Sequence, residues 1–188
     1  MRTTDRNPSR HPAPRRSLRL AVLACMVALG LLQAMAAAAA DPVPQFPGVR
    51  NAPDPGELSY GAWFQTHQPV KIVFAVASPG DADLKESLHN AALSIQYLKL
   101  KKIDYRIEFV LYGNAVRAAD PMSQSYAGLG DLMQALHEVG VDFVVCFNSL
   151  DELGMQKSDL YPFMTLVPSG ILEIVRREAD GYAYIRNF

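Results

Sequence analysis

Two periodicities alternate along the chain between residues 70 and 186. Nearly continuous apolar runs, typical of strands buried on both faces, are separated by segments whose apolar residues recur every three or four positions, as on one face of a helix. The pattern predicts five strands, at 70–77, 105–112, 141–147, 163–167 and 182–186. It also predicts four helices, with apolar faces over 84–98 and 129–139, a short helix opening at 149, and a helix over 170–178.

Turn and capping residues separate these elements. The sequence Ser-Pro-Gly-Asp at 78–81 breaks the first apolar run, and Gly140 ends the second helix. Ser149 with Glu152 three residues later fits a capping box, and we expect Ser169 to cap the last helix. Alternating strands and helices form βαβ units with right-handed crossovers. The predicted fold class is a single-domain three-layer α/β/α sandwich with a mostly parallel, five-stranded, Rossmann-like sheet.

Composition divides the chain into three segments: a signal peptide at 1–40, a Pro-rich leader and aromatic connector at 41–68, and the α/β domain at 69–188. The leader over 41–56 contains five Pro, so we expect it to be extended and mobile. In the connector, Tyr60, Trp63 and Phe64 follow helical spacing. They form either a short helix or aromatic packing against the main body, and we favour packing.

The signal-peptide interpretation rests on a basic n-region, an apolar run and a stretch of small residues: Arg15, Arg16 and Arg19, then 20–32, then 36–40. Cleavage is expected between Ala40 and Asp41. The apolar run is shorter than the roughly 18 residues that a membrane span needs, so a retained anchor is the weaker interpretation. Cys25 lies inside the run, which weakens a lipid-attachment interpretation. We expect export to a bacterial-type periplasm, by the general or the twin-arginine route.

Charge is distributed unevenly between these segments. Residues 1–40 hold six of the 18 basic residues and one of the 19 acidic ones. Residues 41–188 therefore carry 12 Lys and Arg against 18 Asp and Glu, a formal charge of −6. An acidic mature protein argues against nucleic acid as a partner and against a basic membrane-binding surface.

Cys146 is the only cysteine left after cleavage. One thiol cannot form an internal disulfide, and an unpaired thiol in an exported protein is either intermolecular or reactive. Cys146 ends the third predicted strand, and the carboxyl ends of parallel strands form the ligand-binding edge of such sheets. Two interpretations stay open. The N–H groups of the following helix stabilise a thiolate, or the apolar neighbours bury the thiol as a small hydrophobic residue.

Other residues near this edge are candidates for a ligand pocket: Asn114, Asn148, Ser149 and Ser169. The sequence holds neither a glycine-rich phosphate loop nor a metal-type cluster of Cys and His, so we expect no cofactor and no metal. Glu86, Glu108 and Asp142 have no second acid at catalytic spacing, and we expect them on solvated faces.

Several segments share their order and spacing with a known family: VKIVFAV at 70–76 followed by Gly80-Asp81, the helix with Asn90, FVLYGNAV at 109–116, GVDFVVCFNSL at 140–150 and LVPSGILEIVRREADGYAYI at 166–185. Over residues 70–186 the chain resembles the DsrE/DsrF-like family of small α/β proteins, which is associated with bacterial sulfur metabolism. It is most similar to the exported branch, in which a signal peptide precedes one such domain.

The resemblance implies a Rossmann-like parallel sheet, usually assembled as trimers or hexamers. In sulfur-relay members a cysteine after the third strand accepts sulfur as a persulfide, and Cys146 falls at the matching position. A sulfur donor or acceptor protein is then an expected partner. Two departures stand out. Relay members work in the cytoplasm, whereas this chain is predicted to be exported, and no second thiol or nearby His is evident to activate Cys146.

Two hypotheses follow. In the first, the protein handles sulfur in the periplasm, with Cys146 as nucleophile and persulfide carrier. The helix start at Asn148 and Ser149 stabilises the anion, and Asn114 and Ser169 line the pocket. In the second, the protein is a non-catalytic, oligomeric small-ligand-binding or assembly module, and Cys146 is structural. The sequence leans toward the first hypothesis.

Overall fold

The computed structural model describes residues 42–77 and 80–186. The predicted signal peptide and Cys25 lie outside the described residues. Within them, no helix is long and apolar enough to cross a membrane.

The five predicted strands form one sheet in which every neighbouring pair is parallel. The order across the sheet is β4-β3-β2-β1-β5. The strands are β1 (Val70–Val76), β2 (Tyr105–Leu111), β3 (Val141–Cys146), β4 (Thr165–Val167) and β5 (Ala183–Arg186). The predicted fold class is confirmed.

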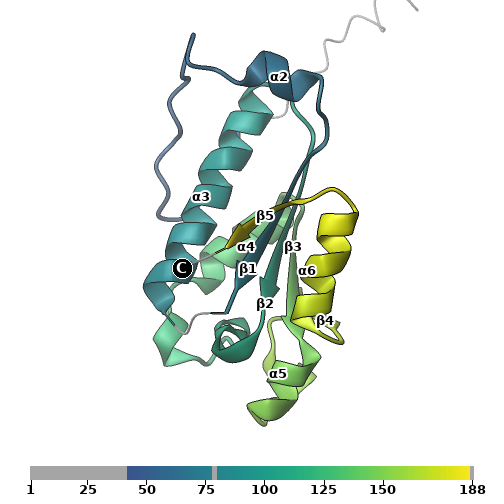
Figure 1. Cartoon of the computed structure of the whole chain (residues 1–188). Helices are drawn as coiled ribbons and strands as arrows, with labels where there is room; N and C mark the ends of the chain where they lie inside the picture. Colours follow the sequence, from purple (N-terminus) through teal and green to yellow (C-terminus); the bar gives the residue numbers. More distant parts are fainter. Residues whose placement is uncertain (1–41, 78–79, 187–188) are drawn as a thin grey trace, which may run out of the picture. The chain divides into compact units, whose positions relative to one another are not determined.

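Helices cover both faces of this sheet (Figure 1). Helices α3 (Asp81–Leu100) and α4 (Gly130–Glu138) pack on one face, and α6 (Gly170–Ala179) packs on the other. The short helix α5 (Phe147–Glu152) follows β3 directly. The remaining helical elements are α2 (Gly61–Gln65) and the 3₁₀ turns η1 (Gly113–Ala119), η2 (Gln124–Tyr126) and η3 (Lys157–Asp159).

Two apolar cores result from this layering. The larger core lies under α3 and α4 and is crossed by a row of three phenylalanines, Phe74, Phe109 and Phe143, at equivalent register positions of β1, β2 and β3. Their rings stack at centroid distances of 4.6 and 5.1 Å. The smaller core lies under α6 and centres on Val73, Ala75, Val110, Val144 and Ile174. The side chains that alternate along each strand therefore serve different cores.

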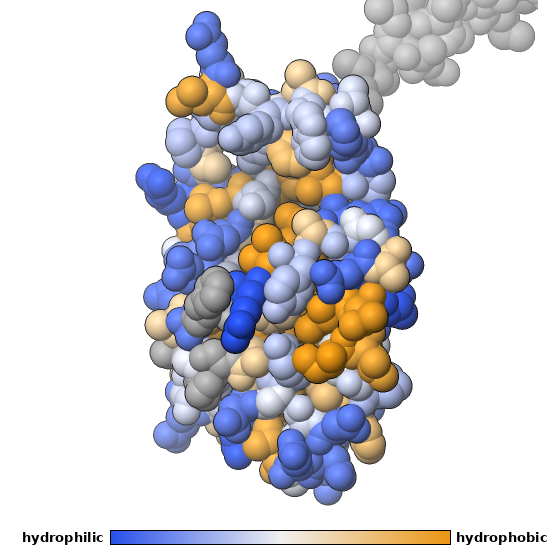
Figure 2. Space-filling view, viewed as in Figure 1, coloured by the Kyte–Doolittle hydropathy of each residue, from blue (hydrophilic) through white to orange (hydrophobic). Residues whose placement is uncertain are grey.

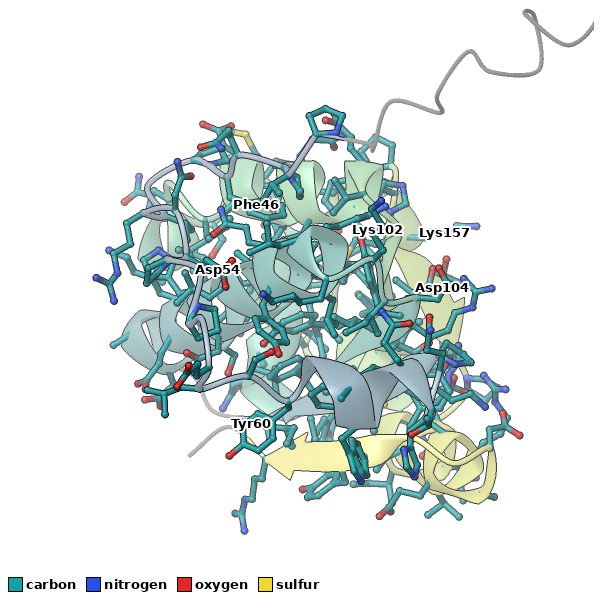
Figure 3. All side chains as sticks on the ribbon, turned by 90° about the horizontal axis from the view of Figure 1, so that it is seen from above. Phe46, Asp54, Tyr60, Lys102, Asp104 and Lys157 are labelled. Carbon is teal, nitrogen blue, oxygen red and sulfur yellow. The ribbon has the colours of Figure 1, made fainter. Side chains whose placement is uncertain are left out.

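The leader, expected to be extended and mobile, lies against α3. Phe46 is only 5% exposed and packs into the larger core. The buried side chain of Gln96 on α3 binds the leader twice: its Oε1 accepts the N–H of Ala52 at 2.7 Å, and its Nε2 donates to the carbonyl of Pro44 at 3.2 Å. Figure 3 shows Phe46 within this segment beside α3.

The aromatic connector forms a helix, contrary to the expectation of packing on the main body. Tyr60 and Trp63 are exposed, and Phe64 is half-buried. The aromatic side chains contact one another instead: the Trp63 ring lies 5.0 Å from that of Phe64 and stacks on His67 at 4.0 Å. The aromatic side chains thus stack on one another, while Ser59 and Gln65 join the connector to the C-terminal end of α3 by hydrogen bonds.

Two predicted boundaries are also corrected. β4 begins at Thr165, two residues later than predicted, because Phe163 lies in a turn and stacks on Tyr161 at 5.4 Å. Helix α5 begins at Phe147, and its N-cap is Cys146. Ser149 is therefore not a cap, because its hydroxyl oxygen accepts the N–H of Gly113 instead.

Candidate active site

At the carboxyl ends of β3 and β4, the helices that follow the two strands pack on opposite faces of the sheet. After β3 the chain enters α5, whose Leu150 packs into the larger core. After β4 it enters α6, which packs on the smaller core. Cys146 pairs with Val167 in the register of these neighbouring strands. Ligands of open α/β sheets bind at such a switch point, so the geometry places Cys146 where a site is expected.

The start of α6 lies close against Cys146. A Cβ atom added to Gly170 would stand 3.3 Å from the Cβ of Cys146 and 2.8 Å from the Cβ of Tyr112. The second distance is too short for any real side chain, so only glycine lets the backbone come this near. Cys146 itself is 5% exposed. The thiol is consequently enclosed by β2, β3 and the first turn of α6.

The surroundings of Cys146 favour its ionised form. Burial raises the pKa of the thiol, but hydrogen bonding to the hydroxyl of Ser149 and to the backbone N–H groups of Gly170, Ser149 and Asn148 lowers it, and the net shift is downward. The Cys146 side chain makes no capping hydrogen bond to α5, and a neutral thiol is a poor acceptor. A thiolate is a much better acceptor, so these donors act mainly on the charged form.

The predicted pocket residues lie near this edge but differ in what they do. Ser149 is buried, and its oxygen accepts the N–H of Gly113 at 2.8 Å. Ser169 caps α6, as predicted, by accepting the N–H of Leu172 at 3.4 Å. Asn114 in η1 and Asn148 in α5 are exposed, and Asn148 acts on the sulfur through its backbone.

Two residues at this enclosure, Gly170 and Tyr112, were not among the predicted pocket residues. Gly170 carries a sequence signal. A glycine placed directly after a capping serine, at the first position of a helix, indicates that the helix backbone packs closely against a neighbouring element. Tyr112 directly follows β2 and forms the part of the enclosure that faces Gly170. Burial and the neighbouring Tyr184 raise the pKa of its hydroxyl, and Arg186 acts in the opposite direction. Tyr184 and Arg186 both lie on β5, so this strand also acts on the same edge of the sheet.

A buried ionic cluster lies farther along the same face of the sheet. Glu108 on β2 is 1% exposed, so its predicted solvated position is wrong. Its Oε2 accepts a hydrogen bond from Nη2 of Arg177 on α6, and Nε of Arg177 donates to Glu173 at 3.1 Å. The sequence could not show this pairing, because Arg177 lies 69 residues from Glu108.

Burial raises the pKa of Glu108 to about 7, even though Arg177 opposes the shift. Glu108 lies four residues before Tyr112 on β2, or about 13 Å at 3.3 Å per residue. The cluster therefore joins α6 to the sheet but does not reach the thiol. In the described part of the chain, no group of three or more His, Cys, Asp or Glu side chains is arranged to hold a metal ion.

The fold defines a class: small α/β proteins built on one parallel sheet, here with a cysteine at the carboxyl end of β3. A family model matches residues 70–186 and identifies the particular family. The chain belongs to the DsrE/DsrF-like family. No curated protein matches the chain.

Solved structures also resemble this chain. A protein of unknown function from Methanobacterium thermoautotrophicum, MTH1491, is 29% identical, with a TM-score of 0.54 over 62% of this chain and 98% of that one. The ychN protein from E. coli is 21% identical, with a TM-score of 0.45 over 63% of this chain and 99% of that one. The first likeness supports the shared fold.

Proposed function

We propose that this protein accepts sulfane sulfur on Cys146 and carries it as a persulfide. Membership of the DsrE/DsrF-like family supports a role connected with sulfur metabolism. The observation that carries the proposal is the lowered pKa of a thiol at a topological switch point, surrounded by donors from α5 and α6. The thiolate is the form that attacks sulfur.

The proposed reaction is a thiol–persulfide exchange. The Cys146 thiolate attacks the outer sulfur of a persulfide or polysulfide, R–S–SH. A bond forms between Sγ and that sulfur, the donor S–S bond breaks, and its electron pair leaves on R–S⁻. The product is Cys146–S–SH, and the number of electrons is unchanged, so no further oxidant is needed. The N–H groups of Asn148, Ser149 and Gly170 then stabilise the bound persulfide anion.

A second candidate is a non-catalytic binding or assembly module with a structural cysteine. The burial of Cys146 favours it, since a small buried thiol also serves as packing.

The proposals for assembly and location apply to both candidates. Exposed Ile171, Leu172 and Val175 form an apolar patch on α6 (Figure 2), which supports a homo-oligomer. The N-terminal segment supports export to the periplasm.

Intact-mass spectrometry separates the two candidates. Purified protein lacking residues 1–40 is incubated with inorganic polysulfide, and Cys146→Ala is treated in parallel. A gain of one or more sulfur atoms, reversed by reductant and absent from the variant, supports the persulfide proposal. No gain, together with a thiol that is alkylated only after denaturation, contradicts it and favours a structural cysteine. Circular dichroism of Cys146→Ala checks that the variant is folded.

A further inference from the structure

Ser149 differs from an ordinary helical serine. A serine within a helix commonly donates to the carbonyl four residues back, as Ser94 on α3 does to Asn90 at 2.7 Å. Ser149 is 8% exposed, and its Oγ instead accepts the N–H of Gly113 from the turn after β2 at 2.8 Å. Its hydroxyl thus joins the ends of β2 and β3.

The hydrogen bond from Gly113 restricts the direction in which the Ser149 hydroxyl proton can point. A hydroxyl has one proton to donate and two lone pairs that accept. Because a backbone N–H already occupies one lone pair, the proton must point elsewhere. Cys146 lies three residues earlier, and among the groups that lower the pKa of its thiol the Ser149 hydroxyl contributes most.

The backbone at Gly113 is shaped for this contact. Gly113 has φ of +55°, in the left-handed region that side chains other than glycine rarely adopt. This conformation follows the end of β2, and the N–H of Gly113 donates to Ser149 on α5. The donor to Ser149 is consequently part of the backbone and cannot rotate away.

We propose that Ser149 is a positioning residue, which the Gly113 N–H orients so that its hydroxyl proton is held on the Cys146 sulfur. The inference rests on the proposed function, since it concerns the thiolate that would take up sulfur. Loss of the hydroxyl removes a donor that stabilises the charged sulfur but leaves the backbone donors in place.

The test is the rate of Cys146 alkylation by iodoacetamide as a function of pH. In Ser149→Ala we expect the apparent pKa of the thiol to rise by about one unit, which slows alkylation about tenfold at pH values below both pKa values. Ser149→Thr keeps the hydroxyl and should restore the profile. Ser87→Ala is the matched control, because Ser87 is also buried but lies on α3 and is not among the groups that shift the pKa of Cys146.

A second pair of variants keeps the test decisive if Ser149→Ala is unstable. Ser149→Thr and Ser149→Val have the same shape and differ only by the hydroxyl. An unchanged thiol pKa in folded Ser149→Ala, or equal values for the Thr and Val variants, overturns the inference. The alkylation profile does not depend on a sulfur donor. A raised pKa in a protein whose wild type takes up no polysulfide sulfur therefore supports the role of Ser149 and refutes only the persulfide proposal.

Discussion

Glu108 makes the stability of the domain depend on pH, and Glu108→Gln should remove that dependence. The carboxyl is buried on the central strand β2 and bonded to Arg177. Gln has the shape of the protonated carboxyl: its oxygen accepts from Arg177, and its amide can donate to Glu173 as the carboxyl proton would. The variant thus mimics the neutral form at every pH.

The magnitude follows from the shift in pKa. Burial raises the pKa of Glu108 from an ordinary value of 4.5 to about 7. The folded state therefore binds the proton more tightly than the unfolded chain does, and this contribution is complete below pH 4.5 and lost as the pH rises through 7. At 1.36 kcal/mol per unit, the loss is about 3 kcal/mol. The pKa of Glu173 is shifted downward, chiefly by Arg176, so its contribution changes at lower pH.

Urea unfolding at half-unit intervals from pH 4.5 to 8.5 measures this difference. We expect the wild type and Glu108→Gln to be similar at pH 4.5 and to diverge until the variant is about 3 kcal/mol more stable near pH 8. Glu178→Gln, on the exposed side of α6, serves as the control and should follow the wild type. Parallel curves for wild type and Glu108→Gln across the range would refute the reasoning.

Two further predictions concern the leader and the start of α6. Gln96→Leu removes both hydrogen bonds to the leader, so we expect residues 42–56 to become susceptible to limited proteolysis while the sheet stays folded; cleavage at the wild-type rate would contradict this. Gly170→Ala forces a Cβ against Tyr112, so we expect a loss of about 1–3 kcal/mol in unfolding free energy and a higher thiol pKa at Cys146. Urea unfolding and the alkylation profile measure both effects, and an unchanged profile would contradict the close approach of α6.

Much of the fold could be predicted because the three central strands, β1, β2 and β3, are largely buried on both faces. A run such as residues 70–76 reads as a strand without any tertiary information, and the helical spacing between runs fixes the connections. The position of Cys146 follows from the same reasoning, since the parallel sheet places every strand end at one edge.

What the sequence missed depends on contacts between distant residues. The burial of Glu108 requires Arg177, which only the folded sheet and α6 bring together. The docking of the leader depends on side chains at α3 that face it, among them Gln96 and Lys101. Ser149 fits a capping box locally, but the N–H of Gly113 competes for its hydroxyl. Local patterns cannot reveal such competitors.

The order of the strands has a consequence for when the surroundings of Cys146 are completed. β1 pairs with β5, the last strand in the described chain, so one side of β1 cannot be completed until the C-terminal residues are available. Contacts between such distant segments form slowly. Gly170 also follows β3, and its N–H reaches the sulfur only when α6 has docked. The surroundings that lower the pKa of Cys146 are therefore complete only after the segment C-terminal to β4 has packed on the sheet.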